Sequence, residues 1–247
     1  MKALLGLMAS VLLIGSMQVS AKNYVIGVES LNYYPLYLGR GKTYTGYARE
    51  LLDSFGKANG HSFTYKVLPV KRLLSEFLTG NLDFKYPANG KWAPNAKQGH
   101  KIAYSDSTVE YIDGLMTTSG NAKLTAENLT TLGTLRGFTP WVFMDDISKG
   151  SLKLFETDAL ESLISMTSSG RVQGAYINVV VARYYVDNQL KKPGVLTFNS
   201  GLPHARDHFL LASIKHPKIV QEFNDFLASE KDLVDKLKDK YQVRLNN

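Results

Sequence analysis

Residues 46–67 read GYARELLDSFGKANGHSFTYKV, and this stretch predicts a helix followed directly by a strand. Four apolar residues recur at helical spacing and share one face, namely Ala48, Leu51, Leu52 and Phe55. Gly60 stands just past them, where a residue free to adopt a left-handed conformation commonly ends a helix. Residues 63–67 then alternate between apolar or aromatic and polar side chains, which is typical of a strand. Helices that lead into strands are the repeat from which parallel sheets are built.

The same alternation extends outward on both sides. Upstream, residues 24–28 (YVIGV) form a short apolar run that predicts a buried strand, and residues 29–45 are expected to be a loop that carries four tyrosines. Downstream, residues 70–78 predict a second amphipathic helix that stops at Gly80, and residues 82–86 alternate again. We therefore expect the first half of the chain to form a largely parallel sheet with helices on both faces.

A second run of the same kind begins after the polar segment at residues 119–121. Its predicted strands are residues 132–135, 152–155, 174–177, 194–198 and 209–212. Its predicted helices are residues 179–190, 217–227 and 231–241. Thr139 and Pro140 predict a further helix start, with Thr as the N-cap and Pro at the first helical position. Asp158 and Glu161 resemble a capping box ahead of another helix.

The N-terminus has the layout of a secretory signal peptide. Lys2 gives a positive start, residues 3–17 are apolar, and residues 19–21 (VSA) offer small side chains where a signal peptidase cuts. The apolar run is shorter than the roughly 20 residues that span a bilayer. We expect cleavage after Ala21, export to the periplasm, and a remaining chain of 226 residues for one large domain or two modest ones.

Composition excludes several classes of protein. The chain has no cysteine, and so it has no disulfide framework, no thiolate nucleophile and no cysteine to which a lipid could be attached. An exported chain without disulfides has to rest on its hydrophobic core. The net charge of +7 falls to +6 without Lys2, and the basic residues are scattered rather than gathered in a long block. We therefore expect no nucleic-acid partner.

Several short motifs, taken in their order along the chain, resemble one family. They are YYPLY (33–37), GYARELL (46–52), LTGNLD (78–83), IAYSD (102–106), LGTLRG (132–137), GRVQGAY (170–176) and KDKY (238–241). This order resembles the family 3 extracellular solute-binding proteins, the periplasmic receptors of polar amino-acid importers. The resemblance covers nearly all of the chain after residue 21. It implies an α/β, two-lobed type II periplasmic binding protein fold, in which each lobe is a mostly parallel sheet flanked by helices.

The resemblance also implies how the chain is divided. Residues 22–117 are expected to form the first part of lobe 1, residues 118–204 an inserted lobe 2, and residues 205–247 the return to lobe 1 with its C-terminal helices. A ligand is expected in the cleft between the lobes, at the carboxyl ends of strands in both sheets. Hinge closure would then bury it.

The function implied is the capture of a small polar ligand for an ABC-type importer, by a monomer with no cofactor, no metal and no catalytic residue. Delivery to an inner-membrane permease and reporting to a membrane sensor are both open as partner roles. A dehydratase-like enzyme on the same fold is a further alternative, with Glu29 and Glu110 as the nearest acid or base candidates. His204 and His208 lie four residues apart, but the segment is expected to be a loop or strand and has no evident third metal ligand.

Two aromatic residues are expected to contact the ligand. Tyr33 stands where many relatives place a ring against the ligand, although a tyrosine that only packs the lobe is the plainer interpretation. Trp92 lies in the segment that follows the predicted strand at residues 82–86, and its indole could stack on a ring or on a sugar face. Both would supply apolar contact area at the mouth of the predicted cleft.

Three cationic residues and one amide complete the predicted site. Amino-acid binders of the family carry an arginine after this strand that clamps the ligand carboxylate, but this chain has no arginine between Arg72 and Arg136. Lys91 and Arg72 are the candidates for that charge, and Arg136 adjoins the predicted helix start, whose free N–H groups favour an anion. Asn178 stands where these receptors carry an aspartate for the ligand ammonium group. These departures leave the ligand class open and make a standard α-amino acid less expected.

Overall fold

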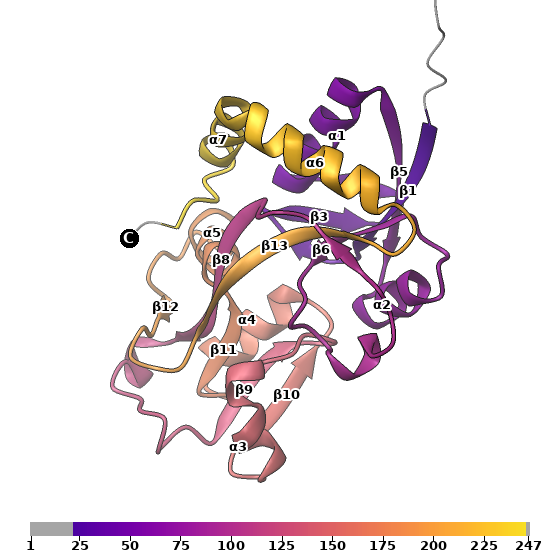
Figure 1. Cartoon of the computed structure of the whole chain (residues 1–247). Coiled ribbons are helices and arrows are strands. Elements are labelled where there is room, and N and C mark those ends of the chain that lie inside the picture. The colour runs from indigo at the N-terminus through magenta and orange to yellow at the C-terminus, as the bar shows by residue number, and fades with distance from the viewer. Residues whose placement is uncertain (1–21, 246–247) are drawn as a thin grey trace, which may run out of the picture.

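The computed structural model describes residues 22–245, and the chain forms two lobes joined by a pair of long strands (Figure 1). The predicted signal peptide, residues 1–21, lies outside the described residues. Within residues 22–245, no helix combines the length and the apolar character needed to cross a membrane.

Lobe 1 is built on three parallel strands in the order β5-β1-β6. These strands are β1 (Lys22–Glu29), β5 (His61–Leu68) and β6 (Phe84–Ala88). The helices of this lobe are α1 (Tyr47–Asn59), α2 (Val70–Leu78), α6 (Pro217–Ser229) and α7 (Lys231–Lys240), with a short 3₁₀ turn, η1 (Asn95–Lys97). Helix α1 ends at Gly60, which has a φ of 68° in the left-handed region that favours glycine. The predicted order of strands and helices in this half is confirmed.

Lobe 2 repeats the plan with three parallel strands in the order β10-β9-β11. They are β9 (Thr131–Leu135), β10 (Lys153–Thr157) and β11 (Gly174–Asn178). The helices are α3 (Met144–Ser148), α4 (Leu160–Ser168) and α5 (Val179–Tyr184), with 3₁₀ turns η2 (Ser119–Asn121) and η3 (Trp141–Phe143) and a π-helical turn, η4 (Tyr185–Gln189). Both lobes are therefore mostly parallel sheets flanked by helices, as expected.

Two antiparallel strands connect the lobes, β8 (Val109–Thr117) and β13 (Ala205–Ser213). Strand β13 pairs with β6 in lobe 1, and β8 pairs with β11 in lobe 2, so one continuous sheet runs through the molecule. Two short strands extend it, β7 (Ala103–Tyr104) on β13 and β12 (Thr197–Phe198) on β8. Pairing of β8 with lobe 2 already begins at Asp113, so the chain crosses within β8 rather than at its end. The boundaries at residues 117 and 205 remain a prediction.

The segment at residues 29–45 is a small sheet, and the expectation of a loop there was wrong. Its strands are β2 (Asn32–Tyr33), β3 (Tyr37–Arg40) and β4 (Thr43–Thr45). Tyr33, Tyr37 and Tyr44 are buried, and their rings follow one another at centroid distances of 5.2 and 6.2 Å, with Tyr65 a further 5.2 Å on. Stacked rings bury a large apolar area, which stabilises a segment that the sequence presents as a loop.

Two predicted helix caps were also wrong. The Thr139–Pro140 pair precedes the short 3₁₀ turn η3, whose first N–H, that of Trp141, donates to the Thr139 carbonyl at 2.8 Å. Helix α4 begins after Ala159 with no side-chain cap, because the Asp158 carboxylate accepts a hydrogen bond from Arg136 Nε at 2.6 Å instead. The charge-assisted hydrogen bond from Arg136 therefore replaces the bond that the Asp158 carboxylate would make to backbone N–H groups of α4.

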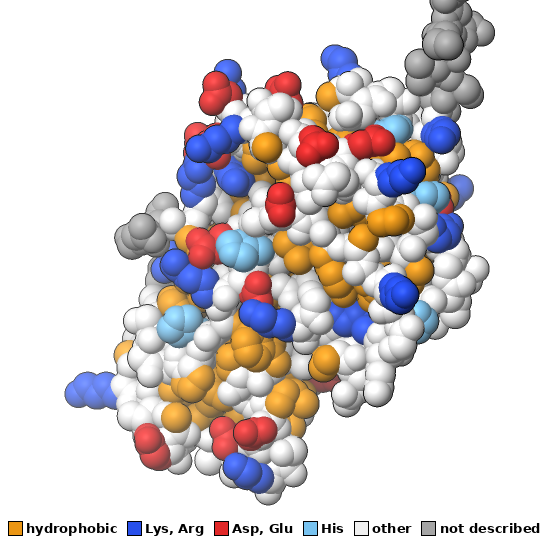
Figure 2. Space-filling model, viewed as in Figure 1, with side chains coloured by type: hydrophobic (Ala, Val, Ile, Leu, Met, Phe, Trp, Pro, Cys, Tyr) orange, Lys and Arg blue, Asp and Glu red, His pale blue; other side chains and the backbone are white. Residues whose placement is uncertain are grey.

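The surface carries charges of both signs. On the face shown in Figure 2, Lys and Arg side chains are interspersed with Asp and Glu, and apolar side chains are exposed over lobe 2. The large exposed apolar residues of that lobe include Trp141, Met144 and Phe155.

Phe55 is the centre of the aromatic core between α1, β5 and α6. It is fully buried, and its ring lies 5.9 Å from Phe63, 5.0 Å from Phe223 and 5.6 Å from Phe226, measured between ring centroids. A large side chain enclosed by three other rings leaves a cavity when it is truncated, because the neighbours cannot all collapse into the space.

We expect Phe55→Ala to lower the free energy of unfolding by about 3–5 kcal/mol. The control is Phe155→Ala, which removes the same atoms from a side chain that is 42% exposed, and we expect it to change stability by less than ~0.5 kcal/mol. Urea denaturation followed by circular dichroism measures both. Equal losses in the two variants would show that lobe 1 does not depend on this aromatic cluster.

Candidate functional site

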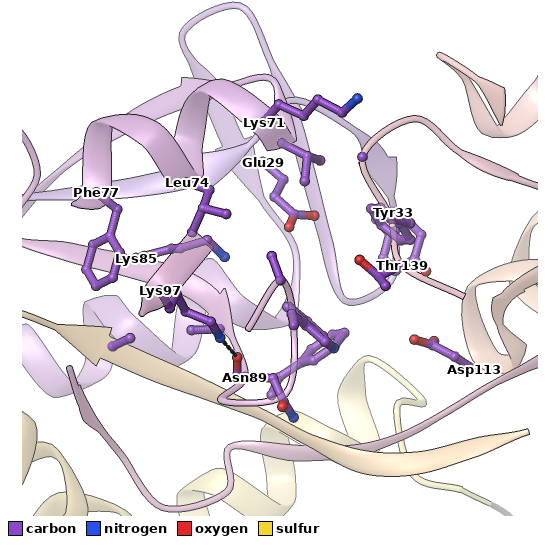
Figure 3. A pocket seen from close by; sticks show the side chains of 18 of the residues that line it. Glu29, Tyr33, Lys71, Leu74, Phe77, Lys85, Asn89, Lys97, Asp113 and Thr139 are labelled. Atoms are coloured by element: carbon purple, nitrogen blue, oxygen red, sulfur yellow. Dashed lines mark hydrogen bonds between the residues drawn. The ribbon is translucent and has the colours of Figure 1, made fainter. Parts of the chain in front are cut away.

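A cavity of about 350 Å³ lies between the two lobes (Figure 3). Its walls include residues at strand ends in both sheets. Glu29 ends β1, Asn89 follows β6, Gly137 follows β9, and Ile177 lies near the end of β11, while α2 contributes Leu74. The cavity therefore occupies the crevice outside the carboxyl ends of parallel strands, which is where open α/β sheets bind ligands.

The lobes touch one another around this cavity. The Tyr33 ring of lobe 1 lies edge-to-face on Phe138 of lobe 2 at 5.5 Å, and its hydroxyl accepts a hydrogen bond from the Asn178 backbone N–H at 3.2 Å. Asn32 Nδ2 donates to Glu161 Oε1 across the lobes at 3.2 Å. The two lobes are therefore in direct contact beside the cavity.

The buried Lys85 and the half-buried Lys97, both of lobe 1, form a basic end of the cavity. Lys97 Nζ donates to the carbonyls of Asn89 and Gly90 at 2.7 and 2.8 Å and to the Tyr104 hydroxyl at 3.3 Å. Burial lowers the pKa of Lys97 to about 8, and the charge of Lys85 adds to this effect. Lys85 Nζ donates to the Pro87 carbonyl, and burial lowers its pKa also. Among the described residues, neither ammonium group is within ion-pair distance of a carboxylate.

Glu29 lies in the wall beside this basic end. Its carboxylate is 3% exposed and accepts a hydrogen bond from the Tyr37 hydroxyl. Burial raises the pKa of Glu29, whereas the charge of Lys85 and the hydrogen bond from Tyr37 act in the opposite direction. Glu29 and Lys85 therefore offset part of each other's charge.

Polar atoms without partners gather at the other end of the cavity. Asp113 Oδ1 and the Tyr176 hydroxyl are both buried, and both residues line the cavity. Neither atom has a hydrogen-bond partner within residues 22–245. Asn178 Nδ2 is a third such atom, and Asn178 is paired directly with Asp113 in the β8–β11 ladder. Burial raises the pKa of Asp113 to about 7, and the negative charges of Glu29 and Asp207 add to it.

Glu156 brings a further carboxylate to the cavity wall from lobe 2, but its oxygens are occupied. Oε1 accepts the Gly137 backbone N–H at 3.1 Å, and Oε2 lies 3.4 Å from Arg136 Nη1. The N–H group that was expected to favour an anion is therefore already bound to a carboxylate of the chain itself. Gly137, Phe138 and Thr139 nevertheless line the cavity, and anion binding by the N–H groups of this segment stays a prediction.

Three of the six predicted site residues lie at or beside the cavity. Tyr33 and Trp92 line it, and Trp92 Nε1 donates to the Tyr111 hydroxyl at 3.1 Å. Asn178 is buried next to them and caps α5, because its Oδ1 accepts the N–H groups of residues 180 and 181 at 2.9 and 3.1 Å. Contact of these residues with a ligand stays a prediction.

The other three predicted residues, Arg72, Lys91 and Arg136, are not brought to the cavity wall. Each is drawn away by a carboxylate. Arg72 Nε lies 2.8 Å from Glu76, Lys91 Nζ lies 2.7 Å from Asp207, and Arg136 Nε lies 2.6 Å from Asp158. Lys91 also lies 5.8 Å from the ring centroid of Trp141 in lobe 2, which suits a contact between lobes better than one with a ligand.

Sequence reasoning missed five charged residues that the structure does place in the wall, namely Lys71, Lys85, Lys97, Asp113 and Glu156. Lys85 carries a usable signal, because it stands in a strand whose five residues are all buried, and lysine is rarely buried without a function or a partner. Lys97 and Asp113 carry none, because the 3₁₀ turn and the strand crossing that aim them inward cannot be read from the residue pattern.

No family model matches the sequence, and no curated protein matches it. Solved structures match over most of the chain. A substrate-binding protein of an ABC uptake transporter from Streptococcus pneumoniae, with bound histidine, is 20% identical at a TM-score of 0.70, covering 91% of this chain and 95% of that one. The BvgS VFT2 domain from Bordetella pertussis is 18% identical at a TM-score of 0.69, covering 89% and 93%.

A third structure, the ancestral amino acid-binding protein AncCDT-1, a precursor of cyclohexadienyl dehydratase, is 19% identical at a TM-score of 0.65, covering 89% and 95%. The chain has the two-lobed type II periplasmic binding protein fold. The fold that the motifs implied is thus confirmed. At identities of 20% or below, likeness shows the fold, and the ligand has to be inferred from the cavity itself.

Asn178 is expected to stabilise the folded state by capping helix α5. We expect Asn178→Ala to lower the free energy of unfolding by about 0.5–2 kcal/mol, because two N–H groups of α5 lose their acceptor. Asn178→Ser keeps a capping oxygen and is expected to lose less than half of that amount. Urea unfolding measures the free energy of unfolding of both variants. Equal decreases in Asn178→Ala and Asn178→Ser would show that Asn178 does not stabilise the fold by capping α5.

Proposed function

We propose that this chain is an exported solute-binding protein that closes its two lobes around one small polar ligand. The observation that carries the proposal is the cavity between lobes that already touch, with charged side chains of both signs in its wall. A volume of about 350 Å³ is at the small end of ligand pockets, which suits a molecule the size of an amino acid. Export to the periplasm rests on the signal-peptide layout of the first 21 residues.

An anionic group on the ligand would meet Lys97. Its ammonium group is fixed by two carbonyls and a phenol, none of which neutralises its charge, and Lys85 adds a second positive charge nearby. The missing arginine of the amino-acid binders is thus replaced by lysines that approach from a different segment. A lysine supplies a point charge rather than a planar fork, so it constrains the orientation of a carboxylate less than an arginine does.

Binding suits this site better than catalysis. Glu29 is held by Tyr37 and faces Lys85, and so it is not free to exchange protons with a substrate. Glu110, the second acid considered from the sequence, is outside the cavity wall and lies 3.4 Å from Arg206. We therefore favour a binding protein over a dehydratase-like enzyme.

Delivery to an ABC-type importer is the role we favour, and sensing is the second candidate, supported by the likeness to the BvgS VFT2 domain. A deletion strain separates them. Loss of uptake of the labelled ligand supports the importer, whereas normal uptake together with a lost transcriptional response to the ligand supports the sensor.

A thermal-shift screen of the purified protein, expressed as the full chain, tests ligand binding. The panel contains amino acids, organic acids, sugars, polyamines and nucleosides. A ligand present at a hundredfold excess over its dissociation constant stabilises the folded state by about 2.7 kcal/mol, which is several degrees in Tm. A saturable rise for one class is expected, and no shift with any class would contradict the proposed function.

Lys97→Ala is expected to weaken binding of the compound found in that screen by about 10- to 100-fold, because a charge-assisted contact is lost. Lys97 is charged below its pKa of about 8, so the affinity of the unaltered protein should fall as the pH rises above 8. The variant should lose this alkaline fall.

The matched control is Lys101→Ala, which removes an exposed lysine from the same region. Isothermal titration calorimetry between pH 7 and pH 9.5 measures all three proteins. If the affinity of Lys97→Ala falls above pH 8 as it does in the unaltered protein, another group is responsible for the pH dependence, and Lys97 is not part of the site.

A further inference from the structure

A second hollow, the hinge groove, lies on the reverse side of the strand that crosses between the lobes. Its volume is about 490 Å³, and its walls are α5 with η4 of lobe 2 and α7 with residues 242–245 of lobe 1. Figure 1 shows α5 and the segment after α7 next to each other, beside β8. Ile112 of β8 lines the hinge groove, whereas the next residue, Asp113, lines the cavity. Because successive side chains of a strand point to opposite faces, the strand itself separates the two hollows.

Both walls of the hinge groove contain uncommon backbone conformations. The lobe 2 wall includes η4, a π-helical turn that continues α5 and contributes Asp187 and Asn188. Turns of this kind are rare and occur frequently at functional sites. The lobe 1 wall contains Gln242, whose φ of 53° lies in the left-handed region that favours glycine. Such conformations cost free energy, and their presence on both walls points to a use for the groove.

The charged side chains of the hinge groove are only partly paired with one another. Arg244 and Asp239 neutralise each other, with Arg244 Nη2 donating to Asp239 Oδ2 at 3.4 Å and Arg244 Nε donating to Oδ1. Arg183 and Asp187 are four residues apart, but neither forms an ion pair within residues 22–245. With Lys238, the lining holds three cations and two carboxylates, which is an excess of one positive charge.

Lys238 is the most enclosed of the three cations. Its side chain is 24% exposed, and its Nζ lies 3.9 Å from Asp235 Oδ1, an oxygen that also lies 3.2 Å from Arg244 Nη2. Burial lowers the pKa of Lys238, Asp235 acts in the opposite direction, and the charges of Arg244 and Lys231 lower it further. A cation that shares its one carboxylate and lies near other cations is stabilised by an anion from outside the chain.

The floor of the hinge groove is apolar. Val179 of α5 is buried there, and Ile112 of β8 and Phe198 of β12 are half-buried. Beside them, the Tyr184 ring of lobe 2 lies 4.8 Å from the Tyr34 ring of lobe 1, so the lobes also touch on this side. An apolar floor below cationic side chains suits a ligand that has an apolar body and one negative charge.

We propose that the hinge groove binds a small organic monoanion, whose negative group lies between Arg183 of lobe 2 and Lys238 of lobe 1. The ligand is a carboxylate on an aromatic or branched apolar body, and it bridges the two lobes behind the crossing strand. A rotation about β8 and β13 that separates the walls of the cavity brings the walls of the hinge groove together, so an occupant of the groove opposes opening of the cavity. The groove site is independent of the proposed function, and only this coupling rests on it.

The test uses the purified protein, expressed as the full chain, with benzoate as the probe and benzamide as its uncharged counterpart. Titration calorimetry compares the unaltered protein with Arg183→Gln and Lys238→Gln. The control for charge is Arg171→Gln, which alters an exposed arginine of lobe 2 that lines neither hollow. The control for location is Lys97→Ala, which alters the cavity and leaves the hinge groove intact.

We expect benzoate to bind at least ~10-fold more tightly than benzamide, and each groove variant to weaken benzoate by about 10-fold, because a charge-assisted contact is lost. Arg171→Gln and Lys97→Ala should bind benzoate as the unaltered protein does. Saturating benzoate should raise the affinity of the cavity for the compound found in the thermal-shift screen by about 5-fold or more, and Arg183→Gln should abolish this gain.

The contrary results are distinguishable. The site is overturned if benzoate does not bind, if benzamide binds equally well, or if Lys97→Ala abolishes benzoate binding while Arg183→Gln leaves it unchanged. An unaltered cavity affinity with benzoate bound overturns the bridging of the lobes. Should circular dichroism show that Arg183→Gln does not fold, Lys238→Gln and the comparison with benzamide still decide. If no compound of the screen binds, the proposed function falls, and the benzoate titration still decides the fate of the groove site.

Discussion

The rest of the structure depends on the antiparallel pairing of β8 with β13. These two strands share five consecutive paired rows, from Val109 opposite Phe209 to Asp113 opposite Ala205. Each also completes a parallel sheet, β13 beside β6 in lobe 1 and β8 beside β11 in lobe 2. Because one ladder fixes both sheets, the carboxyl ends of their parallel strands face each other across a single crevice. The cavity is a consequence of that pairing, and so is the path along which the lobes can open.

The charged side chains of the cavity wall come from both lobes. Lys85, Lys97 and Glu29 come from lobe 1, while Asp113 comes from the connecting strand and Glu156 from lobe 2. Opposite charges on facing walls attract a ligand that has a charge at each end, and the low dielectric constant of a closed cavity strengthens both contacts. The chain satisfies Glu29 and Glu156 internally and leaves Lys97 and Asp113 incompletely paired.

Tyr33 makes two of the contacts between the lobes. Tyr33 contributes a ring to Phe138 and a hydroxyl to the Asn178 backbone, and the stack of tyrosines behind it ties this ring to β5. A rigid aromatic side chain held by other rings loses little conformational entropy when the lobes meet. Such a contact favours closure weakly, and a ligand can then shift the balance by binding the closed form more tightly than the open one.

The sequence alone predicted the order of strands and helices, because the spacing of apolar residues is a local property of the chain. The bounds of α1 and α2 were predicted almost to the residue. The two-lobed fold was implied by the order of the motifs. The sequence also predicted Tyr33 and Trp92 at the cavity and Asn178 beside it. It did not predict that Arg72, Lys91 and Arg136 pair with carboxylates of the chain, since whether a surface cation meets a carboxylate depends on neighbours that other segments supply. It also missed Asp113 and Lys97, whose shifted pKa values arise only when the folded chain removes them from water and places other charged groups near them. The local residue pattern therefore determines the helices and strands. Packing between distant segments determines which charged side chains remain unpaired in the cavity.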